Sequence, residues 1–125
     1  MDFTIKKRKS IEKTEVVNPC FKALKILDMH GSKAILEYKR LDAQDIDHKV
    51  GSPDIQVYVE VDGVLHVIMA ECKSPKGKLR TSQKKYRSKY KHLSNVHYIE
   101  VRKVSDLMNK IEELTKFFEN MLNSI

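Results

Sequence analysis

Three helices are predicted along the chain, two of them by apolar residues that recur at helical spacing. The first helix begins at Asn18-Pro19, a pair suited to a helix N-terminus, and ends before Gly31. Thr81 or Ser82 can cap the second, which extends to about Leu93. Ser105 can cap the third, whose apolar stripe is Leu107, Ile111, Leu114, Phe118 and Met121.

Four other segments show the alternation or the short apolar runs of β-strands: 33–40, 54–60, 64–73 and 96–101. In the first, Ala34, Leu36 and Tyr38 are expected to share one face. Asp62-Gly63 is a strong signal for a two-residue hairpin turn. The run Val67–Ala70 is apolar throughout, which predicts a central strand covered on both faces. The resulting order is α-β-β-β-α-β-α, an α/β fold with a mixed sheet of about four strands.

The composition suits one packed domain over residues 1–125, with 1–9 as a basic N-terminal arm. Hydrophobic residues make up 41% and charged residues 33% of the 125 positions, which argues against a disordered chain. No apolar run approaches the roughly 18 residues of a membrane-spanning helix. Cys20 and Cys72 lack CxxC spacing, which favours a reducing cytosolic compartment over a disulfide framework or a zinc ribbon.

Positive charge is concentrated in one segment. The net charge is +7, yet Lys73–Lys91 alone contains nine basic residues and no Asp or Glu. Tyr86 and Tyr90 lie within this segment, and basic residues interleaved with aromatic ones are typical of a polyanion site. The expected phosphate contacts are Lys76, Lys78, Arg80, Lys84, Lys85 and Arg87. The alternative is a helix face that lysines merely keep soluble.

Two carboxylates are expected to meet on neighbouring strands. Asp54 lies eight positions before Asp62, and Glu71 lies eight positions after Gly63. In a regular two-residue hairpin these two acids are directly opposite, with Cβ atoms about 5 Å apart. Lys73 follows Glu71 by two positions and therefore projects from the same face of its strand.

Two carboxylates and a lysine in this arrangement predict a site for a hard divalent cation, Mg²⁺ or Mn²⁺. Such a cation polarises a phosphoryl oxygen and lowers the pKa of a bound water. Lys73 can orient that water or stabilise charge that grows on the phosphate. Taken singly, these residues also fit a solvated ion pair and an ordinary turn. Next to a polyanion-binding segment, their combination favours phosphodiester hydrolysis.

The residues of this site resemble those of the PD-(D/E)xK nuclease superfamily, most closely the virus-type replication-repair nuclease (VRR-Nuc) domain. The similarity rests on Gly51-Ser52-Pro53-Asp54-Ile55, Glu71-Cys72-Lys73, Lys76-Gly77-Lys78-Leu79 and Gln83, and it covers about 18–113. The first two motifs are also similar to those of archaeal Holliday-junction resolvases. The resemblance implies a restriction-endonuclease-like core.

By that resemblance, Asp54 and Glu71 are metal ligands together with the backbone carbonyl of Cys72. Lys73 is the catalytic lysine. Gln83 is the active-site glutamine at the start of the following helix.

Family members also carry a glutamate near the first helix that completes the metal shell. Glu15 is the favoured candidate for this ligand, and Glu12 is the other. The resemblance further implies a homodimer if the substrate is a four-way junction, because two strands must then be cut. The frequent occurrence of the family in viruses suggests a bacteriophage source, with the protein in the host cytoplasm.

Three functions are compatible with these residues. The first is a metal-dependent DNA endonuclease that selects branches, flaps or junctions, since so small a domain has little surface for reading base sequence. The second is a nuclease-like fold that only binds nucleic acid. The third, a lysine-rich adaptor for acidic proteins, predicts binding with no preference for nucleic acid.

Overall fold

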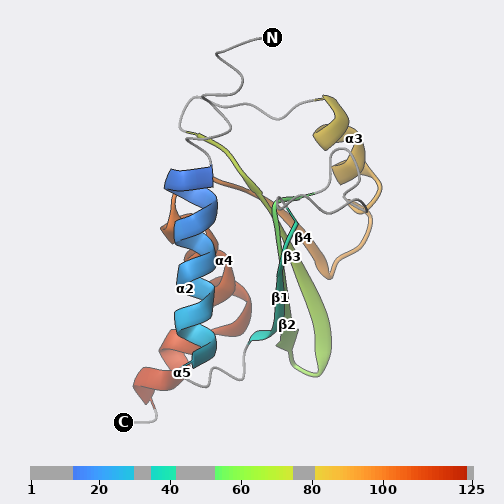
Figure 1. Ribbon diagram of the computed structural model, residues 1–125. Coiled ribbons are helices and arrows are strands. Elements are labelled where there is room, and N and C mark those ends of the chain that lie inside the picture. Colours follow the sequence, from blue (N-terminus) through green and yellow to red (C-terminus); the bar gives the residue numbers. More distant parts are fainter. Residues whose placement is uncertain (1–12, 30–34, 42–52, 75–80, 124–125) are drawn as a thin grey trace.

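The computed structural model describes residues 13–29, 35–41, 53–74 and 81–123, and it shows a four-stranded sheet between helices (Figure 1). Its elements are η1 (Lys13–Val17), α2 (Asn18–Met29), β1 (Ile35–Arg40), β2 (Ile55–Val61), β3 (Val64–Cys72), α3 (Thr81–Ser88), β4 (Val96–Val101), α4 (Val104–Thr115) and α5 (Phe117–Asn123). Helices α2 and α4 cover one face of the sheet, and α3 lies over the other face near one end (Figure 1). The predicted α/β class with a mixed sheet is confirmed.

The sheet has the order β1-β2-β3-β4. The first three strands are antiparallel to their neighbours, and β4 is parallel to β3. Strand β3 is therefore central, as its apolar run predicts. The hairpin turn is also as predicted, because Val61 pairs with Val64 across Asp62 and Gly63. These two turn residues have φ angles of 50° and 80°, the left-handed conformation of a type I′ turn.

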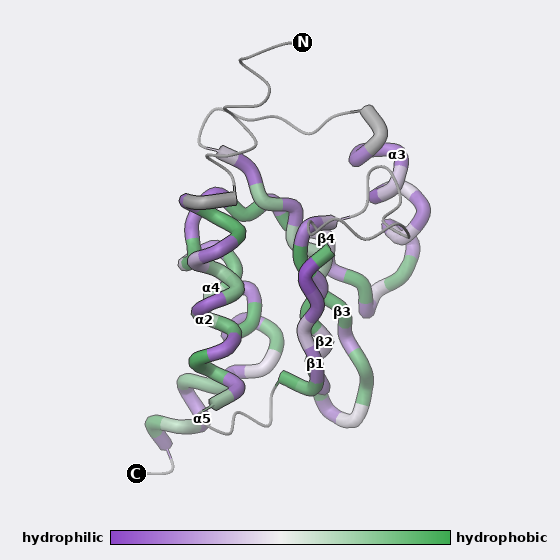
Figure 2. Tube along the Cα trace, viewed as in Figure 1, coloured by the Kyte–Doolittle hydropathy of each residue, from purple (hydrophilic) through white to green (hydrophobic). Residues whose placement is uncertain are grey.

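The apolar core lies between the sheet and the pair α2 and α4. The two-residue period of β2 and β3 directs every second side chain towards these helices. The buried residues of this face include Ile55, Val57, Val59, Ile68, Ala70 and Cys72 from the strands, and Leu24, Leu107 and Ile111 from the helices. In Figure 2, α3 is mainly hydrophilic, whereas α2 and α4 alternate hydrophobic and hydrophilic residues. The opposite face of the sheet is thus covered by a polar helix.

The predicted inward face of β1 is wrong at the beginning of the strand. The register of β1 against β2 shifts between Ile35 and Glu37, which marks a β-bulge. Ile35 is consequently buried and Leu36 is 56% exposed, whereas Tyr38 packs against the core as expected. Residues 33 and 34 lie outside the described residues.

Helix α2 begins at Asn18 as predicted, but the chain is already helical before it. The π-helical turn η1 leads directly into α2, so Asn18 is not an N-cap. Val16 and Val17 are buried in the core, and this packing stabilises helical structure upstream of the predicted start. Pro19 has no N–H to donate to the residue four positions before it, which favours a wider turn at this point.

Helix α3 is shorter than predicted, because it ends at Ser88 and not near Leu93. The N–H groups of Lys89 and Tyr90 donate to carbonyls three residues earlier, and the chain continues in tight turns towards β4.

The last predicted helix is divided into α4 and α5. The break is at Lys116, which has a φ of 53°, and the Glu112 carboxylate accepts hydrogen bonds from the N–H groups of Phe118 and Glu119 at the start of α5. Ser105 is not the cap of α4. The N-cap is Lys103, and the carboxylate of Asp106, three residues later, accepts the N–H of Lys103 at 3.2 Å.

Candidate active site

The polar residues of the candidate site lie on the sheet face that α3 covers. Successive strand residues point to opposite faces, so Glu71 and Lys73 point away from the core in which Cys72 is buried. The Lys73 Nζ atom lies 4.0 Å from Glu71 Oε1, and the two residues are only 4% and 2% exposed. A buried ion pair is costly to desolvate and is weak evidence for a stabilising role, so this pair marks a candidate functional site.

Backbone contacts fix Asp54 at the point where its strand begins. Its N–H donates to the carbonyl of Ala70 at 3.1 Å, and its carbonyl accepts the N–H of Leu41 at 2.7 Å. The N–H of Cys72 donates to Asp54 Oδ2 at 2.8 Å, which orients the carboxylate towards the end of β3.

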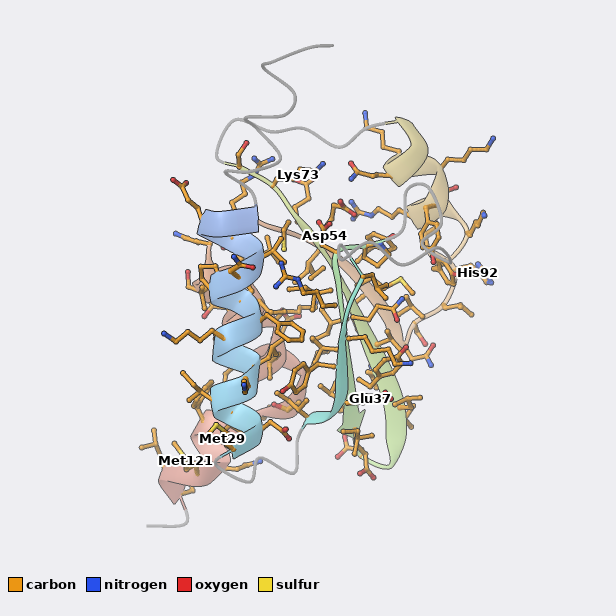
Figure 3. All side chains as sticks on the ribbon, viewed as in Figure 1. Met29, Glu37, Asp54, Lys73, His92 and Met121 are labelled. Atoms are coloured by element: carbon orange, nitrogen blue, oxygen red, sulfur yellow. The ribbon has the colours of Figure 1, made fainter. Side chains whose placement is uncertain are left out.

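The register brings Asp54 and Glu71 to one place, as the sequence predicts. The last paired residues are Ile55 and Ala70, and the Asp54 N–H donates to the Ala70 carbonyl, so Asp54 lies directly beyond the paired positions, beside the end of β3 that carries Glu71. Since Ala70 points into the core, its neighbour Glu71 points to the other face, and the Cys72 N–H holds the Asp54 carboxylate at the same end of β3. Figure 3 shows Asp54 and Lys73 at the same end of the sheet.

Gln83 joins this group from the first turns of α3. Its side chain is 2% exposed, although most of the described side chains of the helix are exposed. The Gln83 Nε2 donates to Glu71 Oε1, the oxygen that also faces Lys73. The amide therefore holds the carboxylate of Glu71 in place and ties α3 to β3.

Cys72 contributes its backbone and not its thiol. A hydrogen bond with Cys20 and burial both raise the pKa of the Cys72 thiol, and the charges of Asp54 and Glu71 raise it further. The thiol is therefore protonated at neutral pH and faces the core, which excludes it as a nucleophile. The role of the Cys72 carbonyl as a metal ligand stays a prediction.

The predicted phosphate contacts divide into two groups. Lys84, Lys85 and Arg87 are exposed on α3, close in sequence to Gln83. The predicted contacts Lys76, Lys78 and Arg80 and the basic arm 1–9 lie outside the described residues.

Among the described residues, no third acidic ligand joins the site. Glu15 is exposed on η1, and Glu12 lies outside the described residues. Within 13–29, 35–41, 53–74 and 81–123, no three His, Cys, Asp or Glu side chains gather in a group that could hold a metal ion. The structure therefore brings two carboxylates together, and the role of Glu15 stays a prediction.

Tyr98 was not predicted and lies on the same face. It pairs with Met69 across β3 and β4, its ring centroid is 6.3 Å from that of Tyr86, and the Arg87 guanidinium lies 5.9 Å from its centroid. Alternation within 96–101 places Tyr98 on one strand face, but the sequence does not reveal which strand β4 joins.

Arg102 is a second residue that sequence analysis missed. Its Nη1 donates to the carbonyl of Ser74 at 2.7 Å, and its Nη2 lies 3.3 Å from Glu100 Oε2. These contacts anchor the chain directly after Lys73.

Comparison of the chain with protein-family models, curated proteins and solved structures found no match. The geometry of the site is thus the basis for assigning a function. Over the described part of the chain, no helix has the length and apolar character to cross a membrane.

Proposed function

We propose that this chain is a divalent-metal-dependent endonuclease that hydrolyses phosphodiester bonds of DNA and belongs to the PD-(D/E)xK class, with VRR-Nuc domains as the most similar members. The observation that carries the proposal is the cluster at the α3 end of the sheet. There, Glu71 is buried between Lys73 and Gln83, and Asp54 is held at the start of the adjoining strand.

The donor set fits a hard cation. Asp54 and Glu71 offer carboxylate oxygens from neighbouring strands, the ligand type that Mg²⁺ and Mn²⁺ prefer. Their two negative charges exceed the single positive charge of Lys73, which favours a cation on this face. When bound, the ion would supply Lewis-acid charge and a water of lowered pKa.

The residues of the chain then have distinct roles. Lys73 places its side-chain nitrogen at the site, in a buried position where its interaction with a developing phosphate charge is strong. Gln83 orients the carboxylate of Glu71, and the N–H of Cys72 orients that of Asp54. The exposed basic residues of α3 bind neighbouring phosphates without reading bases.

A cleavage panel tests this function. The protein is incubated with linear, nicked, flapped and four-way DNA, and with an RNA duplex, in the presence of Mg²⁺, Mn²⁺ or EDTA. We expect metal-dependent cleavage with a preference for branched DNA. Asp54→Asn and Glu71→Gln are nearly isosteric and should each reduce cleavage by about 10²-fold or more while DNA binding persists. Glu60→Gln, at an exposed position of the hairpin, is the matched control. Cleavage retained by purified Asp54→Asn would contradict the proposal.

A non-catalytic nucleic-acid-binding module is the second candidate. It is favoured by one observation, that no third metal-ligating side chain joins Asp54 and Glu71 among the described residues. Calorimetric titration with Mg²⁺ separates the two candidates. The endonuclease predicts binding heat that Asp54→Asn loses, whereas the binding module predicts the same absence of heat in both proteins.

Two further properties accompany the proposed endonuclease. Action on a four-way junction would require two active sites and therefore a homodimer. The free thiols of Cys20 and Cys72 suit a reducing cytoplasm, including that of a bacteriophage host.

A further inference from the structure

A pocket of about 190 Å³ lies between the end of α3 and β4. Its lining residues are Arg87, Tyr90, Lys91, Val96 and Tyr98. Val101 of β4 points into the core, and Val96 and Tyr98 occupy the alternate positions of this strand. They therefore lie on the same sheet face as the candidate site. The pocket is thus formed by aromatic rings and positive charges.

The pocket adjoins the carboxylate cluster. Gln83 and Arg87 are four residues apart on α3, which places them on one side of the helix about 6 Å apart along its axis. Tyr98 pairs with Met69, which lies two residues before Glu71, or about 7 Å along β3. The distance from the site to the pocket along either element therefore corresponds to about two nucleotides of a stacked strand, at about 3.4 Å per nucleotide.

The aromatic rings of this region are already assembled. The centroid of Tyr86 is 5.4 Å from that of Tyr90 and 6.3 Å from that of Tyr98. Arg87 lies over Tyr98, and Lys91 is exposed at the pocket wall. Rings of this kind stack on nucleobases of any sequence, and the cations suit the attached phosphate.

The hydroxyl of Tyr98 does not reach solvent, so Tyr98 contributes its ring to the pocket wall. Among the described residues this hydroxyl has no hydrogen-bond partner. Burial and the charge of Glu71 raise the pKa of Tyr98, and burial raises that of Tyr86 to about 12. Both hydroxyls are therefore uncharged at neutral pH and do not repel a phosphate.

We propose that this pocket binds an unpaired nucleotide of the DNA strand, about two steps from the bond that is cut. The base stacks on Tyr90 and Tyr98, and Arg87 and Lys91 bind its phosphate. A base that remains stacked in a duplex cannot enter such a pocket. The inference rests on the proposed function and specifies its substrate as DNA with a single-stranded tail or flap beside the cleavage site.

Binding to abasic DNA tests the role of the base. Fluorescence anisotropy in EDTA compares a duplex that carries a single-stranded tail with the same duplex whose tail nucleotides are abasic. Both tails have the same phosphates, so only stacking distinguishes them. Wild-type protein should bind the normal tail about five-fold or more tightly than the abasic tail. Tyr90→Ala, at a half-exposed position, should lose this discrimination.

Lys91→Ala and Lys25→Ala form a matched pair for the phosphate contact. Each removes one positive charge, but Lys91 lines the pocket and Lys25 is exposed on α2. Lys91→Ala should weaken binding to both tails and keep the discrimination, whereas Lys25→Ala should match wild type. Equal affinity of wild type for both tails, or discrimination retained in folded Tyr90→Ala, would overturn the proposal that the pocket binds an unpaired base. Because the assay contains no metal, absence of all DNA binding instead refutes the nuclease proposal and the pocket together.

Discussion

The two faces of the sheet are buried to a similar degree but by different chemistry. Cys72 is fully buried against α2 and α4, and its neighbour Glu71, on the other face, is only 2% exposed. On the first face the partners are apolar side chains. On the second they are Lys73 and Gln83. One strand therefore contributes to the core and to the candidate site by alternating residue type.

The contrast between the two faces shows where burial indicates a functional requirement. Apolar burial on the α2–α4 face is sufficiently explained by the hydrophobic effect. On the α3 face, burial of charges opposes folding unless partners compensate it, so another requirement must retain them. Substitutions on the two faces should consequently differ in how they change stability and activity.

Substitutions on the α3 face should change stability most. Lys73→Ala removes the ammonium that offsets the buried charge of Glu71, so the metal-free protein should lose about 3–5 kcal/mol of unfolding free energy. The double variant Glu71→Gln/Lys73→Met removes both charges and should recover most of this loss. Urea unfolding in EDTA measures each value. A double variant as unstable as the sum of its single variants would show that the two charges do not interact.

The corresponding change on the core face affects stability alone. Leu24 of α2 is fully buried, and Leu24→Ala should cost about 2–5 kcal/mol because it leaves a cavity. Ile26 on the same helix is 47% exposed, and Ile26→Ala should change stability by no more than about 0.5 kcal/mol. Thermal unfolding gives both values. Cleavage per folded molecule should match wild type in both variants, and its loss in folded Leu24→Ala would contradict a separation of the two faces.

The parts of the fold that local sequence determines were predicted. The Asp62-Gly63 turn sets the register of β2 and β3, and the two-residue period then assigns Glu71 and Lys73 to one face and Cys72 to the other. These features depend on residues close in the chain, so turn chemistry and alternation are sufficient.

The features that were missed depend on tertiary contacts. Packing of Val16 and Val17 extends the first helix, and the Glu112 carboxylate stabilises the start of α5 after the break at Lys116. At the site, Tyr98 was missed because its position depends on the parallel pairing of β4 with β3. No short sequence pattern specifies that pairing.

A smaller effect is expected at the hairpin, which serves both faces by setting their register. Gly63 has a φ of 80°, and a Cβ added there would meet no atom within 4 Å. The cost of Gly63→Ala is therefore backbone strain alone, about 1 kcal/mol, measured by urea unfolding. Asp62→Gly should be nearly neutral, because glycine readily adopts the φ of 50° at that position. A loss well above 2 kcal/mol in Gly63→Ala would indicate that the register itself changes.

The smallest effect concerns protonation of His97 at the edge of the α2–α4 face. His97 pairs with the core residue Ile68 across the sheet, and its Nε2 lies 2.8 Å from Nδ1 of His66. Burial lowers the pKa of His97 below 6.5, and the positive charge of Lys110 and the His66 ring lower it further against an opposing effect of Glu113. Below pH 6.5 the unfolded chain therefore binds more protons at this residue than the folded chain does.

Stability from His97 is accordingly complete above its unfolded pKa and is lost as the pH falls through its lower folded pKa. His97→Gln should show a smaller decrease in Tm than wild type between about pH 7.5 and about pH 5. His92→Gln, at an exposed position, should retain the wild-type decrease. If Tm decreases as much in His97→Gln as in wild type, protonation at this edge of the sheet does not reduce stability. The α2–α4 face would then tolerate a charge at this edge, and its contrast with the α3 face would apply only to the buried interior of the α2–α4 face.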